Sequence, residues 1–143
     1  MKKRKLILFL AILISICSCI EKEGYYTKEE QDFIDLLCNN TWVKEKKNTD
    51  GSLLLTYYDF NVDATYTKVY KSIDVEGREN VISYKYNWAF GDEYFNSIYF
   101  SDTSEYWMIE KLNVNMLCVY NIHGNIGTSN YRKEYWEFVP YDE

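Results

Sequence analysis

Residues 81–90 read VISYKYNWAF, and their alternation is the clearest structural signal in the chain. Every second position from Ile82 to Phe90 is aliphatic or aromatic, and the residues between them are small or polar. Successive side chains of a β-strand point to opposite faces, so this pattern predicts a strand with one aromatic face. We expect that face to line the interior of a barrel, where it either fills a core or forms the wall of a ligand site.

Similar strand patterns occupy the chain from residue 41 onwards, separated by turns at intervals of about 8 to 14 residues. The predicted strands cover residues 42–47, 52–60, 64–75, 81–90, 94–100, 105–112, 116–123 and 131–140. Turns such as Asn48-Thr49-Asp50-Gly51 separate them, because glycine readily adopts the positive φ of a tight turn. Eight consecutive strands with short connections predict an all-β fold, an up-and-down antiparallel barrel that closes to remove its edges.

One short helix is predicted ahead of the first strand. Thr27 and Glu30 have the spacing of a capping box, and apolar residues then recur at helical spacing over residues 33–37. We therefore expect a helix over residues 28–38, with its apolar stripe covering another element.

The N-terminus predicts export. MKKRK, an apolar run of eleven residues (6–16) and small residues after it are typical of a secretory signal. The run is too short for a transmembrane helix, which needs about 20 apolar residues. We assign residues 1–18 to a signal peptide, 19–26 to a tether and 27–143 to a single barrel domain.

The end of this signal, Ile16-Cys17-Ser18-Cys19, resembles the lipobox of bacterial lipoproteins. It departs from that pattern in having Ile16 in place of the usual leucine and Cys17 at the second position. The resemblance implies an acylated Cys19, with Cys17 as the alternative, and a lipid-anchored protein of the bacterial cell envelope, in the outer membrane. Glu21-Lys22-Glu23 resembles signals that send some lipoproteins to the cell surface, but we favour the interpretation of this segment as a solvated tether.

The predicted mature chain is acidic. Cleavage after residue 18 would leave 12 of the 16 basic residues against all 22 acidic ones, a net charge of −10. Such a charge argues against nucleic acid as a partner and against electrostatic docking on anionic lipid, so we expect membrane contact through the lipid anchor alone.

Four segments together resemble small bacterial lipocalin-like (calycin-type) lipoprotein domains: LLCNNTWVKE (36–45), YYDFNVDATYTK (57–68), IEKLNVNMLCVY (109–120) and KEYWEFVP (133–140). Asn40 stands where such domains usually have glycine. The resemblance implies an eight-stranded barrel with Trp42 packed at its closed end under the N-terminal helix. It also implies a cup for an apolar or amphipathic molecule, without naming that molecule.

The function expected on this basis is a binding protein that buries a small apolar or amphipathic molecule in the cup. The candidate ligand-binding residues are Tyr66, Tyr84, Tyr86, Trp88 and Trp136. The alternative is an interaction or inhibitor protein of the envelope, with a filled barrel that acts through its outer surface. A reachable cavity of at least about 300 Å³ would distinguish the first from the second.

Catalytic and metal-binding signatures are weak. His123 is the only histidine, which excludes a multi-histidine metal site, and we expect no enzyme activity, no metal and no cofactor. Cys38 and Cys118 are the two cysteines of the predicted barrel domain. An exported protein can oxidise such a pair, so either a disulfide or two buried thiols is expected.

Overall fold

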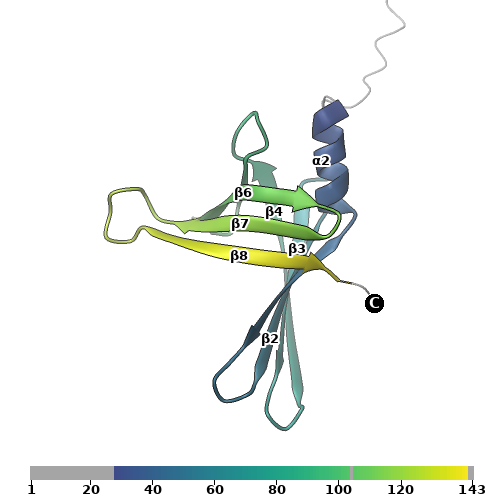
Figure 1. The fold of residues 1–143 in the computed structure, drawn as a ribbon, viewed down its shortest axis with the longest axis vertical. Helices are drawn as coiled ribbons and strands as arrows, with labels where there is room; N and C mark the ends of the chain where they lie inside the picture. The colour runs from purple at the N-terminus through teal and green to yellow at the C-terminus, as the bar shows by residue number, and fades with distance from the viewer. Residues whose placement is uncertain (1–27, 104, 142–143) are drawn as a thin grey trace, which may run out of the picture.

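The computed structural model describes residues 28–103 and 105–141, in which helix α2 (Lys28–Cys38) precedes a closed barrel of eight antiparallel strands (Figure 1). In chain order the strands are β1 (Thr41–Lys47), β2 (Leu53–Phe60), β3 (Thr65–Ile73), β4 (Glu79–Phe90), β5 (Ser97–Phe100), β6 (Glu105–Asn113), β7 (Met116–His123) and β8 (Arg132–Pro140). Each strand pairs with its neighbour in sequence, and β8 closes the barrel on β1. The predicted up-and-down barrel with one short N-terminal helix is therefore confirmed.

Helix α2 covers one end of the barrel. Trp42, at the start of β1, is fully buried beneath it, and its indole N–H donates a hydrogen bond to the carbonyl oxygen of Leu37 at 2.9 Å. The side-chain amide of Asn40 donates to the carbonyl oxygen of Leu36 at 2.9 Å, which satisfies an acceptor at the helix end. The structure thus places Trp42 at the closed end, as expected.

The barrel interior is filled with aromatic rings. The buried rings at its centre belong to Tyr58, Phe60, Tyr66, Phe100, Trp107 and Phe138. The ring centroid of Trp107 lies 4.7 Å from that of Tyr58, 4.8 Å from that of Phe100 and 5.0 Å from that of Phe138. Ring pairs at such distances contribute to stability beyond the apolar area they bury, so this cluster stabilises the barrel.

Strands β1 to β4 extend beyond the barrel. Residues 79–87 of β4 pair with β3, whereas only Trp88, Ala89 and Phe90 pair with β5. On the other side, β8 pairs with β1 only at Trp42 and Val43. The rest of the β1–β2 and β3–β4 hairpins, residues 44–57 and 69–86, continues away from α2 as a four-stranded projecting sheet (Figure 1).

The aromatic face of residues 81–90 is therefore divided. Trp88 is buried and Tyr86 and Phe90 are half-buried, but Ile82 and Tyr84 are 44% and 41% exposed. The expectation that the entire face lines the barrel interior is wrong for Ile82 and Tyr84, because they lie on the projecting sheet.

Strand β5 is shorter than predicted. The segment before it turns instead, because the carboxylate of Asp92 accepts the backbone N–H groups of Tyr94 at 2.9 Å and Asn96 at 3.1 Å. Phe95 has a φ of 57°, and its ring centroid lies 4.6 Å from that of Phe90. A tight side-chain-capped turn thus replaces the first part of the predicted strand.

Candidate functional site

The end of the barrel opposite α2 carries charged and aromatic side chains on the inward-facing positions of the strands. We call this group the mouth cluster. It consists of Lys44, Tyr58, Tyr66, Lys68, Asp102, Glu105, Asn121, His123, Glu134 and Trp136. Its members come from β1, β2, β3, β6, β7 and β8 and from the turn after β5, so the closed barrel assembles them from across the chain.

A polar chain crosses the paired strands β6 and β7. Nδ1 of His123 lies 2.9 Å from a carboxylate oxygen of Glu105, and Nε2 lies 2.6 Å from the side-chain nitrogen of Asn121. These contacts suit a neutral imidazole that donates from Nδ1 to Glu105 and accepts at Nε2 from Asn121. Asn121 is fully buried, and its Oδ1 has no hydrogen-bond partner among the described residues.

Lys68 lies between two tyrosines. Its Nζ is 5.2 Å from the ring centroid of Tyr58 and 5.0 Å from that of Tyr70. Burial lowers the pKa of Lys68, but its interactions with the Tyr58 and Tyr70 hydroxyls outweigh burial and raise that pKa above its usual value. Burial raises the pKa of Tyr58 to about 12. At neutral pH this side of the mouth therefore holds an ammonium ion beside the protonated phenol of Tyr58.

Lys44 of β1, two strands away from Lys68 of β3 in the barrel order, provides a second cation. Its Nζ lies 3.7 Å from the ring centroid of Trp136, within the range of a cation–π interaction. The indole N–H of Trp136 donates to the carboxylate of Glu134 at 3.2 Å. Burial lowers the pKa of Lys44, and the charge of Glu134 opposes that effect.

Little space remains between these side chains. The hydroxyl of Tyr66 donates to the carboxylate of Asp102 at 2.6 Å and joins the core to the mouth. The cavity that these two residues line together with Tyr58, Lys68 and Trp107 has a volume of about 10 Å³. That is room for about one water molecule, because a cavity needs about 10–15 Å³ to hold a single water.

The five predicted ligand-binding residues do not form one wall. Tyr66 and Trp88 are buried in the core, where Trp88 packs against Phe60 and Phe90 at centroid distances of 5.6 and 5.1 Å. The rings of Tyr84 and Tyr86 stack at 6.0 Å on the face of β4 that also carries the buried Trp88, which we call the mouth face. Trp136 lies on β8 beside Lys44.

Sequence reasoning missed the charged members of the mouth cluster. Lys44 and Lys68 lie two residues from Trp42 and Tyr66 on the same strands, so alternation alone assigns them to the inward face. Glu105 faces inward opposite His123 through the β6–β7 register, which no local pattern provides.

The projecting sheet is a second candidate surface. On its mouth face, Tyr70 and Tyr84 make an edge-to-face pair at 6.3 Å. On the opposite face, Tyr57 and Tyr141 pair at 5.1 Å and, with Val69 and Val81 among others, line a shallow hollow of about 370 Å³. Apolar and aromatic side chains thus occupy both faces of one sheet.

The two cysteines are free thiols in the structure, so the disulfide that the sequence allowed is absent from it. Cys38 packs against the core at the end of α2, and burial raises the pKa of its thiol to about 11. Cys118 lies on the face of β7 opposite to that of Leu117 and Val119, with its Sγ 3.8 Å from the sulfur of Met116. The barrel directs the two side chains to different surroundings.

Cys19, the signal peptide and the tether lie outside the described residues. Within residues 28–103 and 105–141, no helix has the length and apolar character needed to cross a membrane. The same residues contain no cluster of three or more histidine, cysteine or acidic side chains able to hold a metal ion.

No protein-family model matches this chain, and neither a curated protein nor a solved structure does. The resemblance to lipocalin-like domains therefore stays a prediction, and what the structure shows is the eight-stranded barrel.

Proposed function

We propose that this chain is an interaction protein of the bacterial cell envelope, anchored by a lipid on Cys19, which acts through its projecting sheet. The observation that carries the proposal is the combination of a filled barrel with a sheet whose exposed residues include Val81, Ile82 and Tyr84. Apolar and aromatic side chains gathered on one exposed element are a mark of interaction surfaces.

The filled interior favours this role over that of a carrier. A drug-sized ligand needs a pocket of about 300 Å³ or more, whereas the cavity at the mouth has a volume of about 10 Å³. Opening a cup there would require separating Tyr58 from Trp107, which pack at 4.7 Å. The same rings that stabilise the barrel therefore oppose its use as a container.

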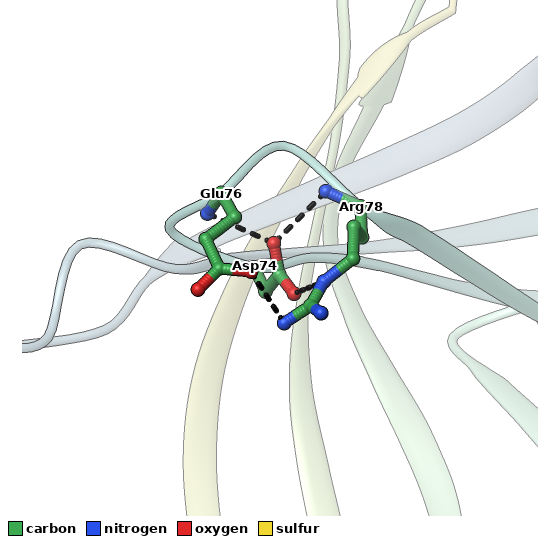
Figure 2. Close-up of polar contacts among 3 residues, drawn as sticks. All are labelled: Asp74, Glu76 and Arg78. Carbon is green, nitrogen blue, oxygen red and sulfur yellow. Dashed lines mark hydrogen bonds and ion pairs between the residues drawn. The ribbon is translucent and has the colours of Figure 1, made fainter.

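The projecting sheet is also held in a defined shape. At the β3–β4 turn, one carboxylate oxygen of Asp74 accepts the backbone N–H groups of Glu76 and Arg78, each at 2.9 Å (Figure 2). Its other oxygen lies 2.7 Å from Nε of Arg78, and Glu76 pairs with the same guanidinium at 2.7 Å. A turn fixed in this way lowers the entropy that a partner would have to remove on binding.

One observation favours a small polar ligand as a second function. Oδ1 of Asn121 is buried at the mouth without a partner among the described residues, and an unpaired buried acceptor is costly. A polar group at the mouth could donate to that oxygen. The two functions are separated by native mass spectrometry of the full chain, purified in detergent from its own envelope. A protein mass without a bound small molecule supports the interaction role. An additional small-molecule mass that is lost on denaturation contradicts it.

Site-specific photocrosslinking tests the surface itself. A photoreactive phenylalanine analogue at position 84, in the full chain in intact cells, should form protein adducts. The same analogue at position 99, where Tyr99 of β5 is 50% exposed, is the matched control and should form few. Equal labelling from both positions would contradict a role for the projecting sheet.

The anchor has its own test. Cys19→Ala should move the chain out of the membrane fraction, because the acyl chains contribute about 0.8 kcal/mol for each buried methylene. Cys17→Ala is the control and should leave membrane attachment unchanged. Retention of the Cys19→Ala protein in the membrane fraction would show that the anchor lies elsewhere.

A further inference from the structure

Strand β4 has an unpaired edge. Residues 79–86 pair with β3 on one side, and no described strand pairs with them on the other, because β5 pairs only with Trp88, Ala89 and Phe90. Residues 79–85 are all exposed. This edge is the side of the β3–β4 hairpin that faces away from the β1–β2 hairpin.

The hydrogen-bond pattern shows which residues present backbone groups at that edge. The N–H of Trp88 donates to Ala64 at 2.9 Å, and the carbonyl oxygen of Arg78 accepts from Asp74 at 3.0 Å, so even-numbered residues bond towards β3. The N–H of Asn87, by contrast, donates to the side-chain oxygen of Ser101 at 3.1 Å. The carbonyl oxygen of Asn87 accepts from the backbone N–H of Ser101 at 3.0 Å. By alternation the odd-numbered residues 79, 81, 83 and 85 direct their N–H and C=O groups outward.

The second open edge of the projecting sheet differs in chemistry. Residues 44–47 of β1, beyond its pairing with β8, read KEKK, and such a run of charges discourages strand addition. The β4 edge instead has five uncharged residues, NVISY (80–84), between Glu79 and Lys85. One edge of the same sheet is thus protected against pairing, and the other is not.

We infer that β4 pairs antiparallel with β4 of a second copy of this chain, about a twofold axis at Ile82. The outward backbone groups require odd-numbered residues to lie opposite odd-numbered residues, so the twofold axis passes at a residue and not between two residues. The central positions of the exposed segment 79–85 are residues 81, 82 and 83. Among these, only the axis at Ile82 places Glu79 opposite Lys85 of the partner subunit, and it does so twice. Charge complementarity therefore selects the second copy and its register.

The paired strands fit sterically and electrostatically. In this register Val81 lies opposite Ser83 of the partner subunit, and Ile82 lies opposite its own copy. Glu79 already holds Lys71 at 2.8 Å through one carboxylate oxygen, and the second oxygen can accept from Lys85 of the partner subunit. An interface of one surface with itself closes at two copies and leaves no further β4 edge to extend.

This inference rests on the proposed function, since it names the partner that one part of the projecting sheet accepts. Sedimentation equilibrium of the full chain in detergent solution tests it. We expect a concentration-dependent dimer that Ser83→Pro abolishes, because proline removes an outward N–H while the pairing of Ser83 with β3 does not use that group. The proline variant should keep its barrel, as near-ultraviolet circular dichroism can verify.

A charge exchange provides the sharper test. Lys85→Glu places like charges at both symmetry-related pairs and should weaken the dimer about tenfold, since two cross-strand pairs change from attractive to repulsive. The double variant E79K/K85E should restore the dimer. Binding of a different protein at this edge would not be restored by that exchange. Lys47→Glu, which makes the same charge change on the β1 edge, is the matched control and should have no effect.

Three results would overturn the inference: a monomer at every concentration that stays soluble, a dimer that survives Ser83→Pro, or a double variant that fails to restore pairing. After any of these results, crosslinks from position 84 to a protein other than a second copy of this chain would still support the proposed function. If those crosslinks are also absent, both the inferred dimer and the proposed function are contradicted.

Discussion

The indole N–H of Trp42 donates to the carbonyl oxygen of Leu37 at 2.9 Å, which joins the first strand of the barrel to the last turn of α2. Both residues are fully buried. The bond satisfies a carbonyl that the helix end would otherwise leave without a partner, and it fixes the helix over the barrel. This bond and the one from the Asn40 side-chain amide to the Leu36 carbonyl oxygen therefore both hold the helix end at the closed end of the barrel.

Trp42→Phe should lower the free energy of unfolding by about 1–3 kcal/mol, because it leaves the Leu37 carbonyl buried and unpaired. Urea denaturation followed by circular dichroism measures the change. Trp136→Phe is the matched control. The N–H of Trp136 bonds to the exposed carboxylate of Glu134, and its loss should cost under about 1 kcal/mol. Equal losses would mean that the Trp42 bond has no special role.

Tyr66→Phe should destabilise the barrel by about 1.5–3 kcal/mol, because its hydroxyl donates to the Asp102 carboxylate at 2.6 Å from a buried position. Burial, and then the bond to Asp102, raise the pKa of this phenol well above its usual range, so it stays a donor at neutral pH. Tyr84→Phe, at an exposed position, should change stability by less than about 0.5 kcal/mol. A Tyr66→Phe protein as stable as the wild type would contradict a structural role for this hydroxyl.

The β3–β4 turn should weaken in acid. The backbone N–H of Arg78, followed by its guanidinium, lowers the pKa of Asp74 below the ordinary 3.8. A lowered carboxyl pKa gives stability that is present above pH 3.8 and is lost as the pH falls through the folded-state pKa. Asp74→Ala should therefore be less stable than the wild type at pH 7, and the difference should shrink below about pH 4.

Urea midpoints at neutral and acidic pH measure that difference. Glu76→Ala is the control for the turn, because it removes a carboxylate from the same turn without removing a backbone hydrogen bond to Asp74. It should have the smaller effect at neutral pH. A difference between Asp74→Ala and the wild type that does not change with pH would contradict the assignment.

The thiol of Cys38 should resist alkylation in the folded protein. With its pKa raised to about 11, the thiolate fraction at pH 8 falls about a hundredfold below that of an unfolded chain. Timed iodoacetamide labelling with peptide mass analysis measures the rate for each cysteine. Cys38→Ala identifies the signal from Cys118, and a peptide pair joined by a disulfide would contradict the free thiols.

Much of the fold follows from local sequence. The helix over residues 28–38 is predicted from its cap and apolar spacing. Strand β7 is predicted from its position between the turn at residues 113–115 and the loop that begins at Gly124, because these signals act between residues close in the chain. Strand β5 was predicted too long, since Asp92 accepts N–H groups from residues that by pattern alone resemble a strand. Side-chain capping competes with strand pairing, and hydrophobic alternation does not record it.

The candidate surfaces were less predictable. Alternation assigns Tyr84 and Trp88 to the same face of β4, but it cannot tell where along that strand the barrel ends. That limit is set by β5, which covers only the last three residues of β4, and by β8, which covers only Trp42 and Val43 of β1. The mouth cluster depends likewise on register across strands, as the contact between Glu105 and His123 illustrates.

The sequence by itself determined an all-β meander with one capped helix and an aromatic inward face, because hydrophobic period, turn residues and caps are local properties. Only the tertiary structure decided that the aromatic rings fill the barrel and that Ile82 and Tyr84 lie beyond it. Strand lengths, register and the point of closure depend on contacts between residues far apart in the chain. The open edge of β4, on which the inferred pairing depends, exists because a long strand meets a short neighbour.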